Sequence, residues 1–213
     1  MWKQIAFMKQ PGKPIALLKT TTCWFLLTIF MAGLVPARAL TAEEKVPTEL
    51  QAKLFLTALT YDKNLQTNAQ DKLTIGIVFF PDTIQSKETA EQFSKALAKF
   101  KDKKVSGHTI NSVVFAYQGN NELKGRVARE GINVMYISNG EKDVIQDVLQ
   151  VCTSEKVFSL GCSARSVLEY SVSMAIGIKA NKPKIYLNLA SAKAEGSNFS
   201  SKFLRVVKIV DNR

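Results

Sequence analysis

Two polar side chains follow strand-like segments of this 213-residue chain and could contact a small ligand. Asp82 comes shortly after the apolar run 72–80, and Tyr117 ends a second β-rich run, 107–117. In an open α/β sheet, ligands bind just outside the carboxyl ends of the strands. Asp82 and Tyr117 are therefore the residues that we would expect at a ligand-binding site.

A cysteine and a serine follow a later strand-like segment, in the order Leu160-Gly161-Cys162-Ser163. A nucleophile elbow requires the pattern G-x-S-x-G, and the second glycine is absent from this segment. A hydrolase of this kind also needs a histidine base, and His108 is the only histidine of the sequence. We predict that the chain is not an enzyme and has no catalytic residues.

Nucleotide-binding fingerprints are missing from the segment FFPDTIQ, which contains the end of the first predicted strand and the residues after it. It holds none of the three glycines of G-x-G-x-x-G, and the sequence contains no P-loop. We therefore predict that the protein binds no cofactor.

The first 39 residues have the pattern of a secretory signal peptide. Four lysines precede an uncharged run at 20–35, and Ala37 and Ala39 occupy the positions that a signal peptidase reads. A membrane anchor is the alternative, although 16 residues are short for a span, which takes about 20. We expect cleavage after Ala39, with 40–47 as a flexible leader and 48–213 as one domain.

Removal of the signal peptide changes the charge of the chain. Five of the 29 basic residues and none of the 18 acidic residues lie before residue 40, so the remainder carries 24 basic and 18 acidic side chains. Its net charge is then +6 instead of +11. Because the basic residues form no long run, we expect no nucleic-acid partner, whereas an acidic protein surface is a candidate.

The cysteine content also depends on export. Cys23 lies in the predicted signal peptide, which leaves Cys152 and Cys162. An even number of cysteines in an exported protein predicts one disulfide between them. A metal site is the alternative, but two cysteines and His108 supply too few soft ligands for a good zinc site. We predict no metal.

Strand-like and helix-like segments alternate between residues 72 and 160. The predicted strands are 72–80, 107–117, 132–137 and 156–160, and the predicted helices between them are 87–101, 120–130 and 142–154. A further predicted helix, capped by Thr48, precedes this set. Such alternation predicts a parallel sheet with right-handed crossovers and helices on both faces. The nearly continuous apolar run 72–80 is typical of a central strand.

The pattern changes after residue 160. Segments 167–180 and 183–190 are predicted strands, and the turn-forming residues at 181–183 indicate an antiparallel hairpin. A closing helix is predicted at 200–207, where apolar residues recur at helical spacing after a serine cap.

Three residues near this helix could anchor a protein partner: Phe199, Lys202 and Arg205. An aromatic ring and flanking cations are typical of contact surfaces. The alternative is that Phe199 packs against the helix and that the two cations are simply solvated.

The segment IYLNLASAKAEGSNFSSKFLRVV, residues 185–207, resembles the C-terminal signature of the YfiR-like family, small exported proteins of Gram-negative bacteria. That signature is a strand closing on Asn, an Ala-rich segment, a Gly and a Ser-Ser-x-Leu-Leu-type helix. The matching positions in this chain are Asn188, Ala190, Ala192, Ala194, Gly196, Ser200, Ser201, Leu204 and Val207. The Trp-Pro that often follows the family's first helix is replaced by residues 63–65, and the family's hairpin glycine pair is missing near 169–171.

The resemblance implies a periplasmic domain with a Rossmann-like three-layer α/β fold: a mostly parallel sheet, a C-terminal antiparallel hairpin and a closing helix. The best known member of the family represses an inner-membrane diguanylate cyclase by direct contact. We therefore expect a regulatory protein that modulates an inner-membrane signalling protein, with a homodimer as a further assembly. The alternative is a periplasmic small-molecule-binding protein with its site around Asp82 and Tyr117.

Overall fold

Strand β1 (Lys72–Phe79) lies in the interior of the sheet, and its residues 73–78 are buried on both faces. The computed structural model describes residues 45–68 and 72–211, which belong to one unit, Glu43–Arg213. The predicted signal peptide with its cleavage site, Cys23 and leader residues 40–44 lie outside the described residues.

Helices and strands alternate along most of the described chain. The helices are α2 (Thr48–Leu59), α3 (Lys63–Asn68), α4 (Ile84–Ala98), α5 (Asn120–Glu130), α6 (Lys142–Glu155), α7 (Ala164–Tyr170), α8 (Leu189–Ala194) and α9 (Ser201–Leu204). The strands other than β1 are β2 (Lys104–Val105), β3 (His108–Ala116), β4 (Ile132–Ile137), β5 (Phe158–Gly161), β6 (Met174–Lys179), β7 (Lys182–Asn188) and β8 (Lys208–Val210).

The described strands form one eight-stranded sheet in the order β2-β3-β1-β4-β5-β6-β7-β8. Strand β1 pairs in parallel with β3 on one side and with β4 on the other, so the strand order reverses at β1. The parallel set continues through β5 to β6, and β6 and β7 form the predicted antiparallel hairpin. The mostly parallel α/β fold predicted from the sequence is confirmed.

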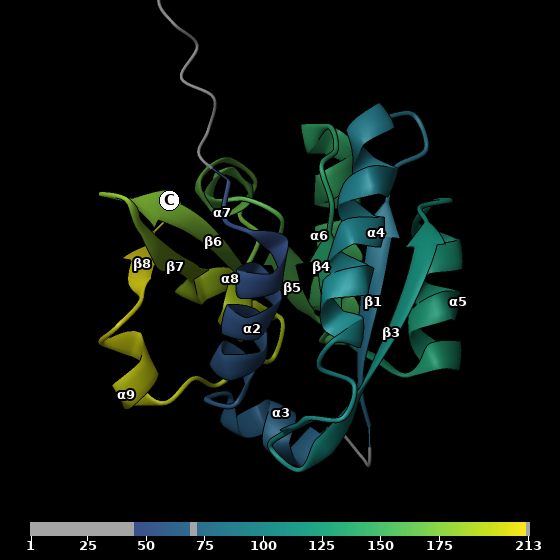
Figure 1. Cartoon of the computed structure of the whole chain (residues 1–213). Coiled ribbons are helices and arrows are strands. Elements are labelled where there is room, and N and C mark those ends of the chain that lie inside the picture. The colour runs from purple at the N-terminus through teal and green to yellow at the C-terminus, as the bar shows by residue number, and fades with distance from the viewer. Residues whose placement is uncertain (1–44, 69–71, 212–213) are drawn as a thin grey trace, which may run out of the picture. The chain divides into compact units, whose positions relative to one another are not determined.

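Apolar clusters cover both faces of the sheet: the front cluster includes Phe55, Phe93 and Tyr136, and the rear cluster includes Leu123 and Ile145. Figure 1 shows α2 and α4 in front of the sheet and α6 behind it, and α5 packs on the same rear face as α6. In the front cluster, the ring of Tyr136 from β4 stacks on Phe93 from α4, with centroids 3.7 Å apart, and Phe55 from α2 meets both rings edge-on. Because helices cover both faces, the carboxyl ends of the strands are where a ligand site is expected.

Helix α7 takes up residues 167–170 of the predicted strand 167–180, and β6 begins only at Met174. Two glycines let this helix lie against the sheet. A Cβ on Gly161 would lie 2.3 Å from the Cβ of Ser166, and one on Gly177 would lie 2.6 Å from the Cβ of Ala164. Glycine at both positions therefore permits the close approach of helix and strand.

The C-terminal end of the sheet also differs from the prediction. Strand β7 stops at Asn188, whose side chain accepts a hydrogen bond from the Ser191 N–H and caps α8. Helix α9 has only four residues, and β8 pairs in parallel with β7. The predicted closing helix is therefore present but short, and strand β8, which was not predicted, forms this edge of the sheet.

The predicted disulfide between Cys152 and Cys162 is not formed in this structure, where both residues are thiols. Cys152 lies on α6 and is fully buried in the rear cluster. Cys162 follows β5 and packs against the front cluster. The two thiols thus pack in clusters on opposite faces of the sheet in this structure, despite their short spacing in the sequence.

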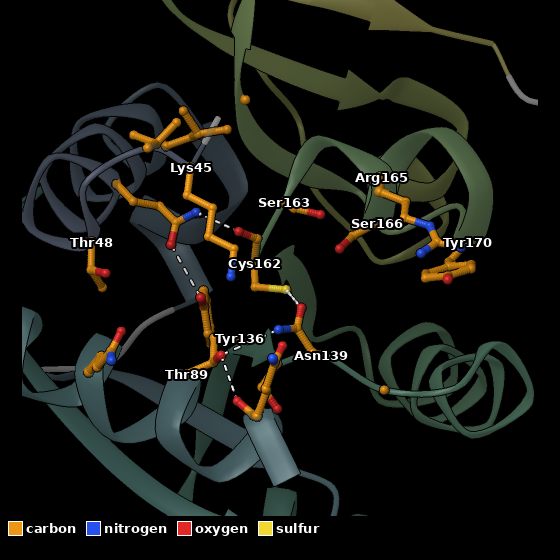
Figure 2. A pocket seen from close by; sticks show the side chains of 18 of the residues that line it. Lys45, Thr48, Thr89, Tyr136, Asn139, Cys162, Ser163, Arg165, Ser166 and Tyr170 are labelled. Atoms are coloured by element: carbon orange, nitrogen blue, oxygen red, sulfur yellow. Dashed lines mark hydrogen bonds between the residues drawn. The ribbon is translucent and has the colours of Figure 1, made fainter. Parts of the chain in front are cut away.

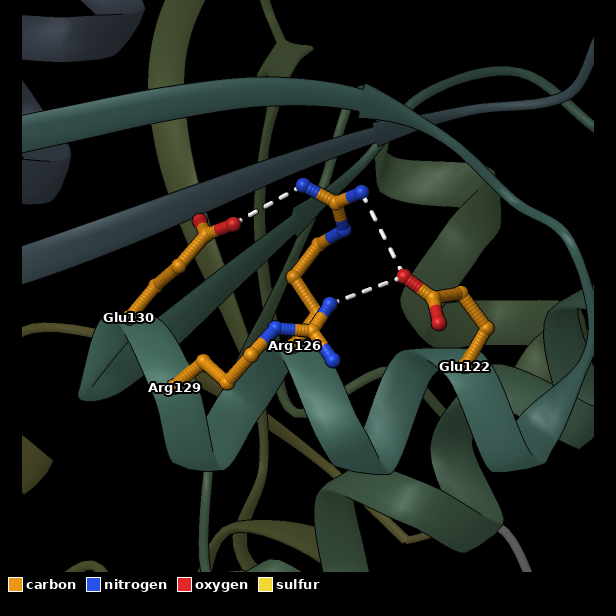
Figure 3. Close-up of polar contacts among 4 residues, drawn as sticks. All are labelled: Glu122, Arg126, Arg129 and Glu130. Atoms are coloured by element: carbon orange, nitrogen blue, oxygen red, sulfur yellow. Dashed lines mark hydrogen bonds and ion pairs between the residues drawn. The ribbon is translucent and has the colours of Figure 1, made fainter.

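A cluster of charged side chains connects α5 to strand β3 (Figure 3). The guanidinium of Arg126 lies 4.8 Å from the ring centroid of Phe115 and contacts Glu130 at 2.8 Å and Glu122 at 3.4 Å. Arg129 makes a second contact with Glu122, at 2.9 Å. Arg126 therefore packs on the ring of the strand residue while its charge is balanced along the helix.

A buried carboxyl group connects the C-terminal segment to the sheet. Glu195, the residue after α8, is 3% exposed and accepts hydrogen bonds from the Ser159 N–H at 2.8 Å, the Ser159 hydroxyl at 2.6 Å and the Ser173 hydroxyl at 2.5 Å. Burial raises the pKa of Glu195 to about 7, although these hydrogen bonds oppose the shift. All three donors are neutral, so they stabilise the carboxylate less than a cation would.

We predict that Glu195 makes the free energy of unfolding depend on pH. A carboxyl group whose pKa rises from 4.5 to about 7 on folding stabilises the folded state fully below pH 4.5 and loses this contribution as pH rises through 7. The shift corresponds to about 3 kcal/mol. Urea unfolding of wild type and Glu195→Gln between about pH 5 and about pH 8 should show the variant gaining stability relative to wild type as pH increases.

The matched control is Glu91→Gln, which changes an exposed glutamate of α4. It should leave the pH dependence of unfolding as in the wild type. If wild type and Glu195→Gln showed the same pH dependence, the buried carboxyl would not be its source.

We also predict that native protein reacts with iodoacetamide at Cys162 and not at Cys152, because only Cys162 is partly exposed. Mass spectrometry of the digested protein measures this, with urea-unfolded protein as the control in which both thiols react. Adding a reductant should leave the melting temperature unchanged. A disulfide-linked peptide containing both cysteines would contradict the separation of the two thiols by the sheet.

Candidate functional site

A pocket of about 360 Å³ lies at the carboxyl ends of β4 and β5 (Figure 2), and we refer to it as the polar pocket. It adjoins the point where the strand order reverses, which is where open α/β sheets bind ligands. The lining residues come from four helices or their flanks (α2, α4, α6 and α7), from the ends of β4 and β5, and from β6: Lys45, Val46, Thr48, Gln51, Gln85, Thr89, Gln92, Tyr136, Ser138, Asn139, Gly140, Ile145, Cys162, Ser163, Arg165, Ser166, Tyr170, Ile176 and Gly177.

A chain of hydrogen bonds crosses the polar pocket (Figure 2). The Tyr136 hydroxyl donates to Gln51 Oε1 at 3.2 Å, and Gln51 Nε2 donates to the Cys162 carbonyl at 2.9 Å. The Cys162 thiol then donates to Asn139 Oδ1 at 2.8 Å, and Asn139 Nδ2 donates to Thr89 Oγ1 at 3.4 Å. The chain links α2, β4, β5 and α4, so it holds the walls of the pocket in place.

Two buried serines fix the start of α4 on the strand ends. The Ser86 hydroxyl accepts a hydrogen bond from the Phe80 N–H at 2.8 Å and lies 2.5 Å from the Ser138 hydroxyl, which donates to the Val78 carbonyl at 2.9 Å. Helix α4 begins at Ile84, three residues before the predicted start at 87, so Ser86 lies in its first turn. Ser86 ties the helix to the ends of β1 and β4.

Two cations, Lys45 and Arg165, are the charged side chains that line the polar pocket. Arg165 Nε contacts Glu169 at 2.6 Å, and its guanidinium lies 5.6 Å from the ring centroid of Tyr170. Burial raises the pKa of Tyr136 well above its ordinary value, so its hydroxyl stays protonated. The pocket lining contains no histidine, and no three metal-ligating side chains among the described residues are placed to hold a metal ion.

Neither residue predicted for the ligand site lines the polar pocket. Asp82 is exposed in the turn between β1 and α4. Tyr117 packs against the rear cluster, where its ring centroid lies 5.9 Å from that of Phe80 and its hydroxyl donates to Asn120 Oδ1 at 2.9 Å. Burial and the nearby Asp147 carboxylate raise the pKa of Tyr117. The pocket opens beyond β4 and β5 instead.

The residues predicted to anchor a partner separate into core and surface. Phe199 is 7% exposed, and its ring centroid lies 5.4 Å from that of Phe158 and 5.0 Å from that of Phe203. It is a core residue and not a surface anchor. Lys202 and Arg205 are exposed.

Sequence reasoning missed most of the pocket residues. Ser138, Asn139 and Gly140 directly follow a buried strand, which is the same signal that singled out Asp82. Lys45 and Gln51 precede or begin the first helix, and nothing in the sequence indicates which strands that helix covers.

Several solved structures have a similar fold. One is a ligand-free, open substrate-binding protein with adhesive properties from Clostridium difficile, with a TM-score of 0.50 and 16% identity over 70% of this chain. Another is a conserved domain protein from Vibrio cholerae, with a TM-score of 0.53 and 14% identity over 79% of this chain. A third is an ABC domain in complex with L-Trp from Streptococcus pneumoniae, with a TM-score of 0.52 and 17% identity over 77% of this chain. The match covers 58%, 61% and 60% of those longer chains, and at these identities it shows a common fold only.

Comparison with curated proteins gives no significant match. Among the described residues, no helix has both the length and the apolar character needed to cross a membrane.

A family model described as YfiR/HmsC-like matches residues 49–208, which include every described strand except the last two residues of β8. The chain therefore belongs to the YfiR/HmsC-like family.

Proposed function

We propose that this chain is a periplasmic regulatory protein that acts by direct contact on an inner-membrane signalling protein, such as a diguanylate cyclase. Membership of the YfiR/HmsC-like family supports this function. The signal-peptide pattern of residues 1–39 supports export, with 48–213 as the regulatory domain. The observation on which the contact rests is an exposed surface at one edge of the sheet.

This surface, which we name the C-terminal edge surface, consists of Lys202, Arg205, Val206 and Ile209. Val206 is 63% exposed and Ile209 is 48% exposed, so two aliphatic side chains face solvent beside two cations. Strand β8 is the last strand of the described sheet, and its outer edge offers unpaired backbone groups. Exposed aliphatic groups next to an open strand edge and basic side chains suit an acidic protein surface or an added strand.

Deleting the gene in the native host should raise cellular cyclic-di-GMP, and restoring the wild-type gene should reverse the rise. The double variant Val206→Asp/Ile209→Asp should fail to restore the low level, because two carboxylates replace the aliphatic contact groups. Mass spectrometry of nucleotide extracts measures cyclic-di-GMP, and immunoblotting confirms equal amounts of protein.

The matched control is Ile84→Asp, which places the same change at an aliphatic side chain that is 94% exposed on α4. It should complement fully. No change in cyclic-di-GMP on deletion would exclude a diguanylate cyclase as the target. Because the open edge of β8 also suits a homodimer, sedimentation of the same variants distinguishes loss of self-association from loss of the partner.

A second candidate function is small-molecule binding, and the polar pocket is the specific observation that favours it. Its volume of about 360 Å³ lies within the range of small-molecule sites. Its walls are held by hydrogen bonds between four elements. A bound ligand would then modulate the regulatory contact.

A further inference from the structure

The charge of the polar pocket is the first indication of what it binds. Lys45 and Arg165 line it, and no aspartate or glutamate does. Helices α2, α4 and α6, of 12, 15 and 14 residues, all begin at this edge of the sheet, and their first-turn N–H groups add positive potential. The pocket therefore favours an anionic group over a neutral or cationic one.

Lys45 is the cation available to a ligand. Arg165 is already paired with Glu169, whereas Lys45 makes no hydrogen bond or ion pair with any residue that the structure describes. Figure 2 shows the Lys45 side chain reaching from the rim toward the middle of the pocket. The next residue, Val46, is buried in the front cluster and fixes the backbone that carries Lys45. Lys45 is an exposed residue, and its amino group thus lies at the pocket without a partner among the described residues.

One available ammonium group matches one negative charge. A phosphate monoester carries nearly two charges and is commonly bound by several backbone N–H groups of a glycine-rich loop or by arginines. The segment after β1 has no such loop, and the one arginine of the lining is ion-paired. A carboxylate needs only the single lysine and the neutral donors around it.

The remaining walls suit a short apolar body. Ile145 and Ile176 are buried side chains that line the pocket, and the ring of Tyr170 forms another wall. We propose that the polar pocket binds a small organic monocarboxylate, with Lys45 holding the carboxylate and the apolar walls holding the body. This assignment rests on the second candidate function.

The test compares matched pairs of probes on purified protein by isothermal titration calorimetry: hexanoate with hexanamide, benzoate with benzamide, and phenyl phosphate as the second kind of anion. At least one carboxylate should bind about tenfold more tightly than its amide, as expected for loss of a charge-assisted hydrogen bond. Lys45→Gln should remove this preference, and higher salt should weaken carboxylate binding.

The matched control is Lys53→Gln, which removes an exposed lysine of α2 that does not line the pocket. It should bind every probe as the wild type does. Equal binding of acids and amides, or tighter binding of phenyl phosphate, would overturn the carboxylate assignment and leave small-molecule binding standing. Absence of binding by all five probes would overturn both the carboxylate assignment and small-molecule binding by the polar pocket.

Discussion

Strand β1 buries side chains on both faces, so helices must cover the sheet on both sides. Because its neighbours run parallel to it, the carboxyl ends of these strands all lie at one edge of the sheet. The polar pocket follows from this constraint. The chain moves from β1 to β3, then crosses back to β4, and the helices leaving β1 and β4 diverge to opposite faces. Residues after these two strands, including Ser138 and Asn139, then surround the gap between them.

The helices and parallel strands between residues 72 and 161 could be predicted from local pattern, because each buries a stripe or a face and ends at a glycine or a polar turn. Gly131, for example, adopts the left-handed conformation after α5, where glycine commonly ends a helix. The helices and strands of the C-terminal part could not be predicted in this way, because packing against other segments decides which of them form. Val167 lies in a helix that two glycines from other strands accommodate, and β8 is too short for its three residues to show a pattern.

The candidate site was harder to predict than the fold. The sequence indicated a site at the carboxyl ends of strands. It did not indicate which strand ends, because the strand order depends on pairing between segments that are far apart in the chain. Asp82 and Tyr117 have the right local context, yet Asp82 faces solvent and Tyr117 packs on the rear face. The two cysteines illustrate the same limit, since ten residues of separation carry them to opposite sides of the sheet.

The buried carboxyl of Glu195 has a consequence for the heat of unfolding. Between pH 4.5 and about 7 the folded protein keeps a proton on Glu195 that the unfolded chain gives up. Unfolding in this range therefore releases protons to the solvent, and the buffer absorbs them with its own enthalpy of ionisation. A calorimetric enthalpy measured near pH 6 would thus differ between phosphate and imidazole buffers, by the fraction of a proton released times the difference in their ionisation enthalpies.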